Sequence, residues 1–148
     1  MKKFAFHLET LMSLREQEEE KARLHLGEIT SLCNQLDMKL EVLAQERTRA
    51  LHTSTGQNIG TELFLQSRYT LRIDHAIEDI LDQRSKAEIQ REQAVLQYQA
   101  AHKNVEILHR LREKKFNEYK KLILKDEQRG IDDLAGARYL QNEESFTT

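Results

Sequence analysis

A seven-residue repeat of mostly apolar side chains constrains the fold of this chain more than any other feature of its sequence. The first of its two series is apolar at seven of eight positions: Ile73, Ile80, Ala87, Ala94, Ala101, Leu108, Lys115 and Leu122. The second series is mixed: Thr70, Ile77, Arg84, Arg91, Tyr98, Val105, Arg112 and Tyr119. Such a sustained repeat indicates a long helix packed in a coiled coil. Its three successive alanines predict that a partner helix approaches closely.

The composition favours long helices over a mixed fold. The 148 residues include no proline, and 73 of them are Ala, Glu, Lys, Leu or Arg. A share near one half of these five types is typical of coiled coils, whereas glycine is scarce and tryptophan is absent. Because tight turns and strands depend on turn-forming and aromatic residues, the chain is predicted to be all-α.

One break interrupts the helical pattern, at a stretch of small polar residues with two glycines. Such side chains compete with the helical backbone for hydrogen bonds. In the C-terminal segment, Gly130 and Gly136 are expected to weaken the helix. The prediction is a single coiled-coil domain, 1–148, with helix 1 at about 3–53, a loop at 54–60, helix 2 at about 59–129 and a C-terminal segment at 130–148.

The first helix supplies a partner for the repeat, and the short loop favours an antiparallel two-helix hairpin. Folding about residue 57 places Ala22 near Ala94 and Leu8 near Glu106, so helix 2 overshoots helix 1 beyond about residue 112. Two successive four-residue steps around Leu36 predict a stutter before Leu40. The apolar series of this helix is Phe4, Leu8, Leu11, Ala22, Ile29, Leu32, Leu36, Leu40 and Leu43.

The overshooting part of helix 2 differs from the rest in charge and in apolar content. Residues 105–129 hold eight Lys and Arg against five Asp and Glu, whereas residues 130–148 hold one Arg against four acids. Exposed apolar stripes mark partner surfaces, so this end is predicted to dock a partner. The stripe, with nothing in the same chain expected to cover it, consists of Phe116, Tyr119, Leu122, Ile123 and Leu124.

The residue pattern argues against an enzyme, a metal site and a cofactor. No two of the six histidines have the i, i+4 spacing of paired ligands on one helix face, and no glycine-rich phosphate loop is present. The single cysteine, Cys33, is expected to be a packing residue and fits a reducing compartment. The pairs Lys114–Lys115 and Lys120–Lys121 alternate with acidic residues, which favours a solvated helix face, or a surface complementary to an acidic protein ring, over nucleic acid as a partner. No apolar run is long enough to span a bilayer, so a cytoplasmic protein is expected.

Both ends of the chain resemble the FliJ family of flagellar export proteins. Residues 4–19, FAFHLETLMSLREQEE, are similar to the family's amino-terminal pattern, which a small residue, here Ala22, follows. Residues 127–138, EQRGIDDLAGAR, look like its carboxy-terminal motif. Two departures are Gly130, within a commonly continuous helix, and Asp133, where Glu is usual. The two motifs, in the family's order, make the resemblance extend over essentially the whole chain.

The resemblance implies a soluble component of the flagellar type III export apparatus, similar to the γ stalk of rotary ATPases. Its partners would be the ring of the export ATPase FliI, the cytoplasmic domain of the export gate FlhA, and export chaperones. It would lie in the cytoplasm, at the inner face of the inner membrane, and would be a monomer in isolation. The residues assigned to the ATPase are Phe4, Phe6, Leu8, Leu11, Leu14, Arg15, Phe116, Tyr119, Ile123, Asp132, Asp133 and Arg138. Those assigned to the gate are Tyr69, Ile73, Ala76 and Ile80.

Other interpretations stay open at this point. Core packing accounts for Ile73 and Ile80 without a gate, because both belong to the heptad seam, whereas Tyr69 and Ala76 lie off it. The equivalent stalk of a virulence secretion system would share the architecture and differ in partners. A structural coiled-coil tether would form a parallel dimer rather than an elongated monomer.

Overall fold

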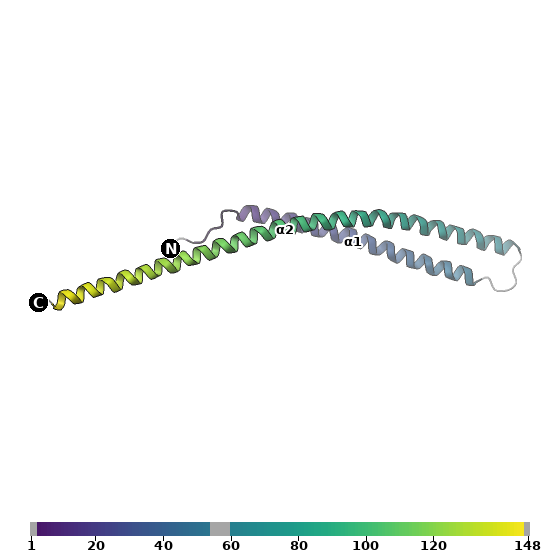
Figure 1. The fold of residues 1–148 in the computed structure, drawn as a ribbon. Helices are drawn as coiled ribbons and strands as arrows, with labels where there is room; N and C mark the ends of the chain where they lie inside the picture. Colours follow the sequence, from purple (N-terminus) through teal and green to yellow (C-terminus); the bar gives the residue numbers. More distant parts are fainter. Residues whose placement is uncertain (1–2, 54–59, 147–148) are drawn as a thin grey trace. The chain divides into compact units, whose positions relative to one another are not determined.

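The computed structural model describes residues 3–53 and 60–146, with side chains up to Tyr139, and contains two long helices in this part of the chain (Figure 1). Helix α1 spans Glu9–His52 and helix α2 spans Gly60–Phe146. No strand occurs among the described residues. The two helices pack against each other, which confirms the prediction of an all-α helical hairpin.

The helix boundaries differ from the predicted ones at two points. Helix α1 begins at Glu9 rather than near residue 3: the Met12 amide donates to the Leu8 carbonyl at 2.8 Å, and Glu9 in the first turn suits the helix dipole. Helix α2 runs through Gly130 and Gly136 instead of ending near residue 129. A helical glycine costs only about 1 kcal/mol, and neither glycine adopts the left-handed conformation with which many helices end.

The chain divides into two compact units, each described separately below. We call Glu16–His102 the hairpin unit. We call Met1–Arg15 together with Lys103–Thr148 the terminal unit, because it combines both ends of the chain.

The core of the hairpin unit is a row of small and branched side chains along the seam. Leu26 and Ile80 pack against the edge of this cluster. Because Ala87 and Ala94 are only 3% and 2% exposed, the two backbones approach closely where the alanine series predicted it. The buried cluster consists of Ile29, Cys33, Leu36, Ala87 and Ala94.

The seam of helix α1 corrects two predictions. Cys33 is 2% exposed and lies in the core, whereas its neighbour Leu32, which the sequence favoured, is 42% exposed. With Cys33 in the seam, the steps around Leu36 are three and four residues, so the predicted stutter before Leu40 is absent. The less exposed positions then follow a regular heptad: Leu26, Ile29, Cys33, Leu36, Leu40 and Leu43.

Ion pairs between the helices define the antiparallel register. The guanidinium Nε of Arg84 lies 2.7 Å from Asp37, and that of Arg47 lies 2.6 Å from Asp74. His102 Nδ1 lies 2.6 Å from Glu19. The residue numbers of each pair add up to 121, rather than the predicted value near 115, so the observed register differs from the predicted one by about six residues. Ala22 and Ala94 are therefore offset by more than a helical turn, and that predicted pairing is wrong.

The terminal unit has the same pair sum and a smaller buried core. Arg112 Nε lies 3.6 Å from Glu9, so α2 continues past the first residue of α1. In this register Leu8 lies opposite residues near 113, not opposite Glu106 as predicted. The buried side chains of the unit are Met12, Val105 and Leu108.

Candidate docking surfaces

An aromatic cluster joins the amino-terminal segment to α2 within the terminal unit. The ring of Phe4 makes an edge-on contact with Phe116, at a centroid distance of 5.2 Å, and a tilted contact with Tyr119, at 5.5 Å. Lys120 Nζ lies 4.5 Å from the centroid of the Phe116 ring, a cation–π geometry. The prediction that nothing in the same chain covers the apolar stripe is therefore wrong for Phe116 and Tyr119. Phe4 thus contacts helix α2 from a non-helical segment that precedes α1.

Beside Phe4 the terminal unit has a cavity of ≈ 610 Å³. The sequence analysis assigned the two aromatic residues that line this cavity, Phe4 and Phe116, to a binding site, but it assigned none of the polar lining residues between 106 and 113. Helical periodicity does not indicate these polar residues, because the cavity forms only where the non-helical Phe4 contacts α2. Its lining residues are Phe4, Glu106, His109, Arg110, Arg112, Glu113 and Phe116.

All residues assigned to ATPase binding belong to the terminal unit, with different degrees of exposure. Leu11 and Leu14 are 37% and 49% exposed. Met12, not Leu11, is the core residue of this turn, at 4%. Phe4, Phe6, Leu8, Arg15, Tyr119 and Ile123 are half-buried. Phe116 is 38% exposed, and Asp132, Asp133 and Arg138 are exposed.

The residues assigned to gate binding all belong to the hairpin unit, but they differ in how deeply they are buried. Ile73 is buried at 4% exposure, and Ile80 packs against the core cluster. Tyr69 is 50% exposed and Ala76 is half-buried. Only Tyr69 therefore presents most of a large side chain to a partner.

Further exposed apolar side chains lie near Tyr69, and the sequence analysis did not single them out. Tyr69 lines a cavity of ≈ 390 Å³ together with Ala50, Thr53, Glu62, Leu65 and Gln66. The Gln66 amide donates to the Ala50 carbonyl at 2.5 Å and ties α2 to the end of α1. The exposed apolar residues on this part of α2 are Leu63, Phe64, Leu65, Tyr69 and Leu71.

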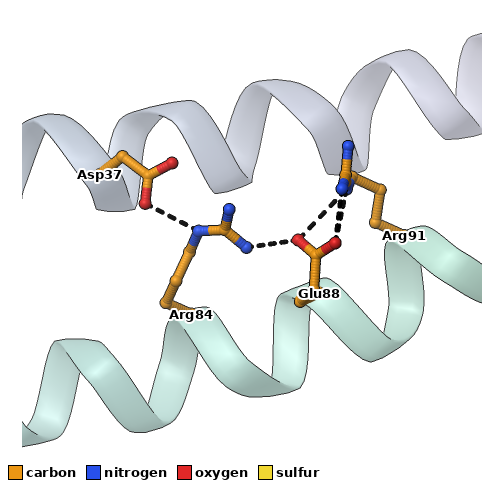
Figure 2. A network of polar contacts seen from close by, with 4 residues as sticks. All are labelled: Asp37, Arg84, Glu88 and Arg91. Carbon is orange, nitrogen blue, oxygen red and sulfur yellow. Dashed lines mark hydrogen bonds and ion pairs between the residues drawn. The ribbon is translucent and has the colours of Figure 1, made fainter.

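A polar network occupies the middle of the hairpin seam, as Figure 2 shows. Arg84 donates to Asp37 of α1 at 2.7 Å and to Glu88 of its own helix at 2.5 Å, and Arg91 donates to Glu88 at 2.5 Å. The hydrogen bonds from Arg91 and Arg84 lower the pKa of Glu88 to about 2. The hydrogen bonds from Arg84 to Asp37 and to Glu88 raise the pKa of Arg84, and the bond to Asp37 contributes more. The network holds one ion pair across the helices and two along α2.

Two searches for other kinds of site found none among the residues that the structure describes. No group of three His, Cys, Asp or Glu side chains lies close enough to hold a metal ion there. None of the described helical stretches is apolar enough over a sufficient length to cross a membrane.

Comparison with known proteins identifies the family. The family model described as flagellar FliJ protein matches residues 4–144. No curated protein and no solved structure matches the chain.

Proposed function

Because the chain belongs to the FliJ family of flagellar proteins, a component of the flagellar export apparatus, we propose that it is the stalk of that apparatus. In this proposal the two ends of the chain dock together in the ring of the export ATPase FliI. The hairpin unit contacts the gate FlhA and escorts export chaperones. The protein thereby lies at the cytoplasmic face of the inner membrane through its partners, and it performs no chemistry itself.

One observation supports this assignment more than the others. The twelve residues assigned to the ATPase come from both ends of the sequence, and all fall in the terminal unit. The four residues assigned to the gate all fall in the hairpin unit. A stalk that enters a ring by one end needs this division of surfaces.

The length of α2 beyond the start of α1 also supports the proposal. Since Glu9 pairs with Arg112, residues 113–146 of α2 extend past the start of α1. At 1.5 Å per residue this is about 50 Å of helix. Its exposed apolar side chains include Leu122, Leu124, Ile131 and Leu134, each at least 60% exposed.

The direct test measures binding to purified FliI. Leu14→Asp changes a side chain that is 49% exposed, so the variant is expected to fold and to bind at least tenfold more weakly. Leu24→Asp is the matched control, because Leu24 is 55% exposed on the same helix but lies in the hairpin unit. Equal binding by both variants would contradict the assignment of the terminal unit to the ring.

A truncated chain separates the two parts of this surface. Residues 1–126 retain the Phe4, Phe116 and Tyr119 cluster but lack Asp132, Asp133 and Arg138. We expect unchanged melting of the hairpin and weaker binding to FliI. Full binding would restrict the site to the assigned residues before 127.

Gate binding is tested on the other unit. Tyr69→Glu is expected to weaken binding to the cytoplasmic domain of FlhA without changing thermal unfolding, because Tyr69 is half exposed. Leu81→Glu, at a residue 51% exposed about three turns further along, is the control. If Tyr69→Glu instead reduces helicity, the residue belongs to the core.

A further inference from the structure

Five cations form a straight line along α2 in the terminal unit. They follow one another at intervals of seven, four, seven and four residues. Eleven residues make about three turns of a helix, so all five project from one face. The structure leaves all five exposed. This basic stripe consists of Lys103, Arg110, Lys114, Lys121 and Lys125.

No acidic residue interrupts the basic stripe. The positions between the cations on the same face are Ile107 and Asn117, both uncharged and exposed. Arg110 pairs with Glu106 at the edge, whereas the four lysines form no ion pair with any residue in the described parts of the chain. Their charges are therefore available to a partner.

The basic stripe lies on the side of α2 that faces away from the packed residues. The buried Val105 and Leu108 lie about half a turn from Lys103 and Arg110, respectively, around the helix axis. A partner could therefore bind the stripe without displacing Phe4 from its contacts with α2. The stripe is in this way distinct from the aromatic cluster, and of its five cations only Arg110 lines the cavity beside Phe4.

Glutamates border the basic stripe on both sides. Glu106 and Glu113 lie along one edge, and Glu118 lies along the other. A broad anionic surface, such as a bilayer of acidic lipids, would be repelled by these carboxylates within a Debye length. A narrow row of carboxylates on a partner would contact only the cations of the stripe. Basic residues beside that row would form ion pairs with the glutamates that border the stripe.

We propose that the basic stripe binds an acidic α-helix of a partner protein. The partner helix presents Asp or Glu at alternating intervals of seven and four residues and lies alongside α2 over about 33 Å. This proposal does not depend on ATPase or gate binding by the same chain.

The test uses the full-length protein and synthetic helical peptides of about seven turns. One peptide has glutamates at the seven-and-four spacing with arginines beside them, and the second has the same composition with glutamates distributed around the helix. Fluorescence anisotropy at about 50 mM salt is expected to show at least tenfold tighter binding of the first peptide. That preference should decline at about 300 mM salt, because exposed ion pairs are screened.

Variants locate the binding to the stripe. The triple variant Lys114→Gln, Lys121→Gln, Lys125→Gln should lose at least tenfold in affinity for the first peptide. The control variant Lys21→Gln, Lys39→Gln, Lys86→Gln removes the same charge from exposed positions of the hairpin unit and should bind normally. Circular dichroism should be the same for both variants, since all six side chains are exposed.

Three outcomes would overturn the proposal. The first is equal binding of the two peptides, and the second is equal loss in the two triple variants. The third is tighter binding of phosphatidylserine vesicles or of polyuridylic acid than of the first peptide, which would assign the stripe to a membrane or to nucleic acid.

Discussion

The two units of this protein bury apolar side chains in different ways. The hairpin unit places Ile29, Cys33 and Leu36 of one helix against alanines of the other, each at most 8% exposed. Among its described residues, the terminal unit buries three side chains and holds Phe4 by aromatic contacts at the surface. The hairpin unit therefore has the larger buried core, although both units also leave large apolar side chains exposed, such as Phe64 in the first and Leu122 in the second.

Polar contacts between helices differ as well. In the described part of the hairpin unit two ion pairs and the contact of His102 with Glu19 join α1 to α2, each at 2.6–2.7 Å. In the terminal unit Arg112 and Glu9 are 3.6 Å apart, and both are largely exposed. Surface ion pairs contribute little to stability, so these pairs act mainly by selecting one alignment of the helices.

The largest expected effect comes from a charge in the hairpin core. Leu36→Asp replaces a side chain that is 3% exposed, and burying an unpaired carboxylate is expected to cost several kcal/mol. The control Met38→Asp, at 67% exposure, should change the free energy of unfolding by less than about 0.5 kcal/mol. Urea unfolding followed by circular dichroism measures both. Similar losses would show that the two faces of α1 are not distinct.

A smaller effect is expected from overfilling the close approach of the helices. Ala94→Leu adds bulk at a position 2% exposed and should cost about 1–3 kcal/mol. Ala100→Leu, on an exposed position of the same helix, is the control. If Ala94→Leu stabilises the protein, the helices are further apart than the burial of Ala94 indicates.

The aromatic cluster should contribute less and only locally. Phe4→Ala removes two ring contacts, each worth about 0.5–1.5 kcal/mol, and should increase amide hydrogen exchange in residues 9–15 and 112–123. Exchange in the buried part of the hairpin unit should not change. Phe64→Ala, at a residue 60% exposed, is the control for losing a phenylalanine. Uniform acceleration along the chain would mean that the units unfold together.

The smallest expected effect depends on pH. Because the pKa of Glu88 is lowered in the folded state to about 2, its contribution to stability is present above the ordinary value of 4.5 and is lost as pH falls from about 4.5 to 2. Thermal unfolding midpoints should therefore fall less steeply in this range for Glu88→Gln than for the unaltered chain. Asp82→Asn, whose carboxylate is paired on the exposed face of α2, is the control. Identical slopes for Glu88→Gln and the unaltered chain would count against the network.

Much of the fold could be predicted from periodicity, and its failures have physical causes. The heptads indicated the seam of α2 through Leu108, because apolar residues recur there without ambiguity. The heptad pattern wrongly placed Leu32 rather than Cys33 in the core. Both side chains are suited to a core, and which of the two is buried depends on how the neighbouring helix packs against α1. The register failed because it was estimated from the middle of the loop, whereas the pairs of Asp37 with Arg84 and Arg47 with Asp74 define it.

The candidate surfaces were less accessible to sequence reasoning. The resemblance assigned binding residues to both ends of the chain. The structure brings Phe4 of one end to Phe116 near the other, a contact that periodicity cannot predict for a non-helical segment. For the gate residues, the seam pattern correctly raised core packing for Ile73 and Ile80. The basic stripe was not predicted. The lysines of the sequence were interpreted as two adjacent pairs, whereas the stripe consists of cations spaced by seven and four residues along one face of α2.

The constant sum of paired residue numbers limits how this hairpin can change in length. From Glu19 to Asp37 and from Arg84 to His102 the chain advances by the same number of residues, and the same equality holds between Asp37 and Arg47 and between Asp74 and Arg84. Removing one heptad from α1 alone would keep its apolar face but shift the ion pairs on one side of the deletion by about 10 Å. Only a second deletion at the matching place in α2 restores them. Longer or shorter versions of this hairpin should therefore differ by paired heptads, one in each helix.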